Sequence, residues 1–398
     1  MEQLIQNFRK KIAYTETDFI RSLMEQINWD ARLIGIKGSR GVGKTTLLLQ
    51  YIKLNLEPDL DRTLYASLDN IWFSEHKLID LVDEFSKRGG KYLFLDEVHK
   101  YAGWSVEIKN IYDDYPELKV VFTGSSLLEI LDARADLSRR AIIYQMFGLS
   151  FREYLNIELK ENFKAYCLAE IIEQHGVISQ QLVSKFKPLR YFESYLKSGY
   201  YPFYRELPDL YYTRIEEVIN MILEIELPLL RNVQTGFIPK LKQLLYIISS
   251  SAPFIPNISK LSERIGVNRE TLLGYLHALN DAHLIFTTYK DTKGISLLQK
   301  PDKIFLENPN LMFAIDEKNV DQANARETFF ANQLRVTNFV ELSAVSDFLI
   351  DGQFTFEIGG GSKKKKQIEN LENAYIAADN IEFGYEKKIP LWLFGFLY

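Results

Sequence analysis

Residues 38 to 45 read Gly-Ser-Arg-Gly-Val-Gly-Lys-Thr and fit the phosphate-loop pattern G-x-x-x-x-G-K-[ST]. Glycines in such a loop let the backbone curl until its N–H groups face phosphate oxygens. The ammonium of Lys44 would then reach the β- and γ-phosphates, and the hydroxyl of Thr45 would bind Mg²⁺. The residues expected to bind the nucleotide are Gly38, Ser39, Arg40, Gly41, Val42, Gly43, Lys44, Thr45 and Thr46. This pattern predicts ATP and Mg²⁺ as cofactors.

A pair of acids follows a second apolar run, in the sequence YLFLDE that ends at Asp96 and Glu97. Four apolar residues indicate a buried strand, and ligands of open α/β sheets bind at the carboxyl ends of such strands. We expect Asp96 to hold Mg²⁺ indirectly, through hydrogen bonds to the groups that coordinate the ion. We expect Glu97 to polarise the attacking water as a general base. The alternative is a solvated strand end.

Two further groups of polar residues are candidates for catalysis. Thr123 and Ser125 follow the next apolar run, where either could sense the γ-phosphate, although Ser125 could equally cap the following helix. Arg139 and Arg140 precede the fifth apolar run, a place suited to an arginine finger that serves a bound or neighbouring nucleotide. An arginine pair on a protein surface is also often only solvated.

The elements that must position these residues fill the first 150 residues. Short apolar runs alternate there with amphipathic stretches, which predicts an α/β fold with a parallel sheet of the P-loop type. The expected strands are 33–37, 63–67, 92–96, 119–123 and 141–145, and the expected helices include 43–54 and 75–86.

The remainder of the chain predicts three further segments. Residues 151–250 are mostly helical, and residues 251–310 follow the order helix, turn, helix, strand of a winged helix, with its turn at Gly266–Val267 and Asn268 as an N-cap. Residues 311–398 predict a small α+β domain with a helix over 325–336 and strands at 346–350 and 355–358. The apolar run PLWLFGFLY at 390–398 is expected to form a buried terminal strand.

The order of the phosphate loop, LDEVHK, FTGSS, LSRR and GLSFREYL resembles the P-loop ATPases of the AAA+ superfamily that carry a DUF4143 region. The resemblance continues through YLKSGYYPF, KPDKIFLENPNLMFAI and FEIGGGSKKKKQI, and so covers nearly the whole chain. It implies a P-loop domain followed by helices, a winged helix and a degenerate fold of the restriction-endonuclease type. Its C-terminal motifs imply no established activity.

Nucleic acid is one candidate partner of the later segments. Between Asn257 and Lys290 four cations stand against three acids, which is little charge for neutralising phosphates, so a packing module is the alternative. Asp347 and Glu357, with Glu327 as a third acid, are spaced like the metal-binding acids of PD-(D/E)xK nucleases. Gly359 stands where that pattern needs a lysine, although the run Lys363–Lys366 could substitute or track a phosphate backbone.

Composition limits the remaining function classes. Lys and Arg number 48 against 53 acids, a net charge of −5, so the chain lacks an overall basic footprint. A single cysteine, Cys167, excludes an intramolecular disulfide framework, and no apolar run is long enough for a membrane helix. We therefore expect a cytoplasmic protein with no membrane partner and leave its oligomeric state open. The leading expectation is an ATPase that moves its later domains; the alternatives are an ATP-gated DNA-associated regulator and an ATP-dependent nuclease.

Overall fold

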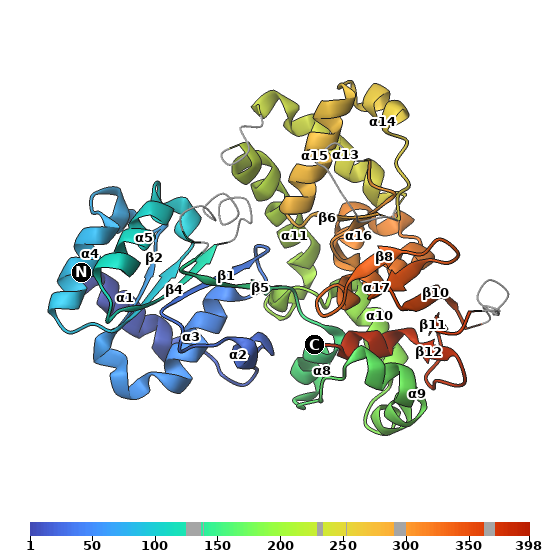
Figure 1. Ribbon diagram of the computed structural model, residues 1–398, viewed down its shortest axis with the longest axis horizontal. Coiled ribbons are helices and arrows are strands. Elements are labelled where there is room, and N and C mark those ends of the chain that lie inside the picture. Colours follow the sequence, from blue (N-terminus) through green and yellow to red (C-terminus); the bar gives the residue numbers. More distant parts are fainter. Residues whose placement is uncertain (125–136, 138, 229–233, 252, 290–299, 362–370) are drawn as a thin grey trace. The chain divides into compact units, whose positions relative to one another are not determined.

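The computed structural model describes residues 1–124, 137, 139–228, 234–251, 253–289, 300–361 and 371–398 (Figure 1). These residues divide into two compact units, Met1–Gly148 and Leu149–Tyr398. The boundary falls near residue 150, and the finer division of the second unit into three segments stays a prediction.

The first unit is built on a parallel sheet with the strand order β2-β3-β4-β1-β5, which confirms the expected α/β class. Its strands are β1 (Leu33–Gly38), β2 (Thr63–Ser67), β3 (Tyr92–Asp96), β4 (Lys119–Gly124) and β5 (Ile142–Met146). Its described helices are α1 (Glu2–Tyr14), α2 (Leu23–Gln26), α3 (Lys44–Asn55), α4 (Leu78–Lys87) and α5 (Trp104–Asp114). β2 and β3 have the predicted bounds, and the other three strands end one residue later than predicted.

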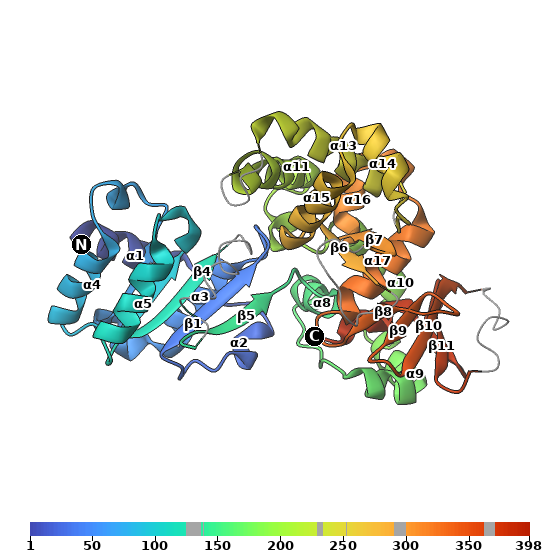
Figure 2. The same ribbon diagram turned by 45° about the horizontal axis from the view of Figure 1, so that its top comes forward.

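Alternation along β3 shows how the layers of this unit are arranged. Leu93 and Leu95 share a buried core with residues of α4 and α5. Phe94, between them, faces the opposite side, where its ring centre lies 6.1 Å from that of Tyr51 on α3. Helix α1 contacts both α3 and β2. The sheet therefore lies between α4 and α5 on one face and α1 and α3 on the other (Figures 1 and 2).

The second unit contains a mixed sheet, β12-β11-β10-β9-β8, and a separate antiparallel pair, β6-β7. Its strands are β6 (Ile285–Thr288), β7 (Lys303–Leu306), β8 (Val340–Leu342), β9 (Phe348–Ile350), β10 (Phe354–Gly360), β11 (Ala374–Asp379) and β12 (Lys388–Pro390). Its described helices are α8 (Phe151–Leu159), α9 (Leu168–Val183), α10 (Pro188–Ser198), α11 (Tyr211–Met221), α13 (Ile238–Ser249), α14 (Ile258–Ile265), α15 (Arg269–Asp281), α16 (Pro309–Asp316) and α17 (Gln322–Leu334). None of the helices in the described ranges is both long and apolar enough to span a bilayer.

The predicted pair of short helices is present as α14 and α15. Gly266 ends α14 with a left-handed φ of 70°, which glycine adopts without strain. Asn268 caps α15 by accepting a hydrogen bond from the N–H of Thr271. The turn and the cap are thus confirmed, and the antiparallel strands β6 and β7 follow in the chain.

The predicted terminal strand is wrong. The short strand β12 ends at Pro390, and Leu391–Phe396 form a 3-10 helix whose residues are all buried. An apolar run that is buried on every side has no periodicity to separate helix from strand. Trp392 and Phe396 pack edge to face within this helix, with ring centres 5.9 Å apart, which supports the helical form.

Candidate nucleotide-binding site

The loop between β1 and α3 has a backbone that requires glycine at several positions. Gly41 and Gly43 have φ angles of 83° and 99°, in the left-handed region. A Cβ atom on Gly38 would lie 2.2 Å from the carbonyl oxygen of Met146 on the neighbouring strand β5. Gly43 is the N-cap of α3 and has no capping side chain, so the first turn of the helix presents its N–H groups to an incoming anion.

Lys44 supplies the cation of this loop. Its ammonium donates hydrogen bonds to the carbonyl oxygens of Gly38 (2.8 Å) and Ser39 (2.9 Å), and the residue is only 5% exposed. The ammonium therefore lies inside the curve of the loop, where phosphate oxygens would replace the two carbonyls as acceptors.

The other residues of the predicted loop differ in what they can offer. Val42 is fully buried, so only its backbone can face a ligand. Arg40 is half-buried and acts electrostatically on Glu97. Thr46 is exposed on the first turn of α3. These positions suit contact through backbone groups more than through side chains.

Asp96 is the centre of the polar network at the carboxyl edge of the sheet. The residue is 2% exposed. One carboxylate oxygen, Oδ2, accepts hydrogen bonds from the hydroxyls of Thr45 (2.6 Å) and Tyr65 (2.7 Å). The other, Oδ1, accepts from the hydroxyl of Thr123 and from the backbone N–H of Glu97 (3.1 Å). Four donors fix the carboxylate in one orientation, so it can position a neighbouring ligand without moving.

The pair Thr45 and Asp96 fits the predicted Mg²⁺ site. Oxygen ligands are those that Mg²⁺ prefers, and it usually takes one or two from the protein and the rest from phosphates and water. A hydroxyl that donates its proton to Asp96 keeps its oxygen lone pairs for the metal. Within the described residues no group of three or more His, Cys, Asp or Glu could hold a metal ion unaided. The donor set therefore suits an ion that arrives with phosphates.

Glu97 follows Asp96 with a left-handed φ of 51°, a conformation that is uncommon outside glycine. Its side chain is 21% exposed. Burial raises the pKa of Glu97 above its ordinary value, and the cations Lys44 and Arg40 oppose that shift. The imidazole Nε2 of His99 lies 3.6 Å from Glu97 Oε2. Burial, aided by nearby cations, lowers the pKa of His99 to about 3, so this imidazole is neutral at pH 7 and brings no positive charge to the Glu97 carboxylate.

Thr123 lies at the carboxyl end of β4, between the strands that carry the loop and the acids. It is fully buried and donates its hydroxyl hydrogen to Asp96. The same oxygen accepts a hydrogen bond from the N–H of Glu97 (3.3 Å). The structure thus brings Thr123 into the network with both acids. Ser125, its predicted alternative, lies outside the described residues.

Arg139 and Arg140 are not brought to the phosphate loop of their own chain. They precede β5, whereas the loop follows the carboxyl end of the parallel strand β1, and a strand of five residues spans roughly 17 Å. Arg140 forms a two-pronged ion pair with Asp113 near the end of α5, through Nε–Oδ1 and Nη2–Oδ2 contacts of 2.9 Å each. Arg139 is exposed. A role toward the nucleotide of a neighbouring molecule stays a prediction.

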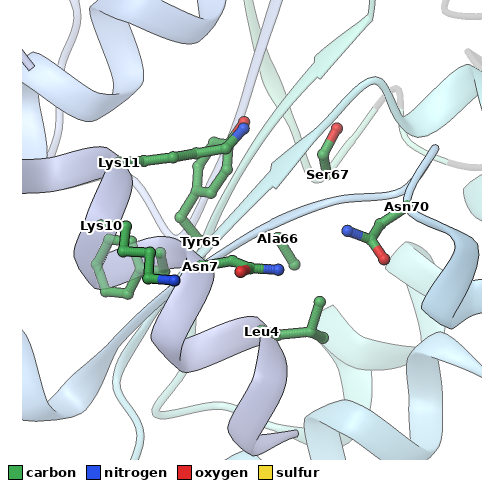
Figure 3. Close-up of a pocket in the computed structure, with 9 residues that line it drawn as sticks. Leu4, Asn7, Lys10, Lys11, Tyr65, Ala66, Ser67 and Asn70 are labelled. Carbon is green, nitrogen blue, oxygen red and sulfur yellow. The ribbon is translucent and has the colours of Figure 1, made fainter. Parts of the chain in front are cut away.

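Sequence reasoning missed Tyr65, whose position inside an apolar strand is typical of a core residue. Its ring packs beneath α1, its hydroxyl bonds to Asp96, and burial with the Asp96 charge raises its pKa far above the ordinary value. A hollow of ≈ 270 Å³ lies beside it, and Figure 3 shows Lys11 of α1 extending over the ring. The ammonium of Lys11 is 5.1 Å from the ring centre. The signal that could have revealed Tyr65 is its polar hydroxyl within an apolar strand, β2, that pairs with the strand ending at Asp96.

One of the three acids predicted in the second unit, Glu327, pairs with a lysine that sequence reasoning also missed. The ammonium of Lys303 on β7 is 3.3 Å from Glu327 Oε2 on α17. Burial raises the pKa of Glu327, Lys303 opposes the shift, and the charges of Asp347 and Glu357 add to it. The lysines Lys363–Lys366 lie outside the described residues. Glu327 is therefore held by an ion pair.

Proteins with similar sequences span nearly the whole chain. An uncharacterized protein of Methanocaldococcus jannaschii is 26% identical, over 97% of this chain and 88% of that protein. An uncharacterized protein of Haemophilus influenzae is 23% identical, over 94% of this chain and 90% of that protein. Both names leave function open.

Two solved structures are similar at low scores. ORC1 of Aeropyrum pernix in complex with DNA has a TM-score of 0.31 and 13% identity, covering 80% of this chain and 92% of that chain. AMPPCP-bound DnaA of Aquifex aeolicus has a TM-score of 0.26 and 18% identity, covering 65% and 84%. Independently of these, residues 30–155 match the family model described as "AAA domain". This segment runs from just before β1 into α8 and contains the loop, Asp96, Glu97 and Thr123, so the part of the chain that holds the predicted nucleotide site is the part that is similar to AAA domains.

Proposed function

We propose that this protein binds ATP with Mg²⁺ and hydrolyses it to ADP and phosphate. The observation that carries the proposal is the hydrogen-bonded set Thr45, Asp96, Thr123 and Glu97 at the mouth of the glycine loop. In this proposal Thr45 is the metal-binding hydroxyl, Asp96 is its carboxylate partner and Glu97 is the general base, and their hydrogen bonds at one edge of the sheet support these roles.

Each residue has a distinct role in the proposed reaction. The ammonium of Lys44 and the first N–H groups of α3 bind the β- and γ-phosphate oxygens. Thr45 would hold Mg²⁺, which neutralises phosphate charge when bound, and Asp96 orients that hydroxyl. Glu97 accepts a proton from the attacking water, with a gain typical of general bases of about 10²–10⁴-fold. Thr123 keeps both acids in register.

We further propose that the nucleotide state changes the arrangement of the second unit. We assign this unit to the helical, winged-helix and DUF4143-type segments. We also propose that the protein is cytoplasmic. A DNA-associated regulator is the second candidate, because α14 and α15 are followed by the strand pair β6-β7 in the order of a winged helix. Against this candidate, the exposed start of α15 carries Arg269 next to Glu270, so its net charge is small. A small net charge favours a role in packing over binding to DNA phosphates.

The test is phosphate release by the full chain with Mg²⁺ and with EDTA, in the presence and absence of duplex DNA. Thr45→Ala should abolish the Mg²⁺-dependent turnover. Thr63→Ala is the matched control, because its hydroxyl bonds only to the Asp59 carbonyl (2.9 Å) among the hydrogen bonds of the described residues and lies at the start of β2. Equal turnover in the Thr45 variant and the control would refute the metal assignment. Turnover that appears only with DNA would favour the regulator.

A further inference from the structure

Arg21 is a buried arginine, 7% exposed, in the segment that leads into α2. Its Nη1 group donates a hydrogen bond to the carbonyl oxygen of Val42 (2.7 Å). Its Nη2 group donates to the carbonyl oxygens of Phe147 (2.8 Å) and Gly148 (2.9 Å). One guanidinium therefore bonds to backbone that is more than a hundred residues apart in the sequence.

The carbonyls that Arg21 contacts lie at two distant points of the chain, the phosphate loop and the end of the first unit. A movement that depends on nucleotide would start at the loop and would have to reach the end of this unit. Val42 lies at the tip of the phosphate loop, between the left-handed glycines Gly41 and Gly43. Phe147 and Gly148 are the last residues of the first unit. Because the guanidinium is planar and its donors have fixed directions, it holds these backbone segments in a defined relation.

We propose that Arg21 is a positioning residue that couples the phosphate loop to the junction between the two units. This inference rests on the proposed function, since it needs a nucleotide in the loop. Phosphate oxygens that take Lys44 away from the Gly38 and Ser39 carbonyls change the hydrogen bonding of the loop. Through the Val42 carbonyl and Arg21, that change reaches Phe147 and Gly148.

A purely structural arginine provides the contrast. Arg32 is half-buried and donates from Nη2 to the carbonyl oxygens of Tyr112 (2.7 Å) and Tyr115 (3.4 Å), at the amino end of β1. It links backbone segments of the same unit, as Arg21 does, but within the described part of the chain its side-chain hydrogen bonds reach neither the phosphate loop nor the junction. Arg32→Lys is therefore a matched control for the loss of a guanidinium fork.

The experiment measures amide hydrogen exchange in the full chain, in the peptide covering residues 147–154, with and without a non-hydrolysable ATP analogue. Binding of a fluorescent form of the analogue is measured in parallel. In the parent protein and in Arg32→Lys we expect the analogue to change exchange at least about fivefold, the lower end of ordinary coupling. In Arg21→Lys the analogue should still bind, but the change should fall below about twofold, since lysine cannot bridge both segments in one geometry.

The outcomes separate the two ideas. Absence of analogue binding to the parent protein overturns the proposed function and this inference with it. Binding with an unchanged exchange response in Arg21→Lys, or with no response in the parent, overturns the coupling role alone. If Arg21→Lys does not fold, Arg21→Gln, which keeps one amide donor, replaces it. Failure of both variants to fold, with Arg32→Lys folded, would assign Arg21 to stability and overturn the proposal.

Discussion

Replacing Glu97 with glutamine should separate nucleotide binding from hydrolysis. The contacts of Glu97 with Asp96 and Thr123 run through its backbone N–H, which Glu97→Gln keeps. The side chain retains its size and its place beside His99, but it loses the carboxylate that accepts a proton. We therefore expect nucleotide affinity to change little and turnover to fall.

The expected loss follows from the role assigned to the carboxylate. A positioned general base contributes about 10²–10⁴-fold in rate, which is roughly 3–5 kcal/mol of barrier. The stability of the fold at pH 7 should rise in this variant, whereas its turnover should fall. A carboxyl whose pKa is raised by burial stabilises the fold below its ordinary pKa and loses that contribution as the pH rises through the raised value. Glu97→Gln should therefore raise the melting temperature at pH 7 and not at pH 4.

The assay combines phosphate release, retention of a fluorescent ATP analogue and thermal unfolding at the two pH values. Glu84→Gln is the control, because Glu84 on α4 forms an exposed ion pair with Arg88, the residue after the helix, that is worth at most about 1 kcal/mol. Turnover at the parental rate in Glu97→Gln would refute the base assignment. A lower melting temperature at pH 7 would refute the reasoning about its buried charge.

Lys44→Ala should abolish nucleotide binding in a fluorescence titration while circular dichroism shows an intact fold, because the ammonium of Lys44 bonds to carbonyl oxygens of the loop and is not part of the apolar core. Normal turnover would exclude the loop as the site. Asp96→Asn should weaken binding in Mg²⁺ but not in EDTA, and should lower stability by about 1–3 kcal/mol because an amide cannot accept all four donors. The turnover of the parent protein should fall on acidification at a higher pH than an ordinary glutamate would give, since the pKa of Glu97 is raised; a pH profile checks this. No DNA cleavage is expected with Mg²⁺ or Mn²⁺, with or without ATP, and cleavage that Glu357→Gln removes would contradict the inactive assignment.

The first unit could be predicted from sequence because its signals are local. The strand Tyr92–Asp96 is an apolar run with a polar end, and its bounds agree with prediction. The strand order could not be predicted, since apolar runs alone do not show which strands are neighbours. The prediction of a strand for the terminal apolar run failed for a related reason. The residues around Trp392 are all buried, so their sequence shows neither helical nor strand periodicity.

The residues of the candidate site also differ in whether a local sequence signal could reveal them. The loop, Asp96 and Glu97 follow a known spacing, and the structure places them together. Tyr65 and Arg21 carry no such pattern: Tyr65 is a strand residue 31 positions from Asp96, and Arg21 bonds to carbonyls 126 and 127 positions away. Their roles arise from tertiary contacts, which a single sequence does not encode in any short motif.

The two hydrogen bonds from Lys44 to its own loop have a consequence for ligand selection. Any anion that enters the loop competes with carbonyl acceptors already in place, and its gain is reduced by the loss of those bonds. Orthophosphate offers a single group of oxygens for this exchange. In the proposed function, a triphosphate chain would engage the helix N-terminus, the lysine and a metal ion at the same time, so it would overcome this competition where the smaller anion would not. Under the proposed function, the loop would thereby favour a triphosphate over abundant inorganic phosphate.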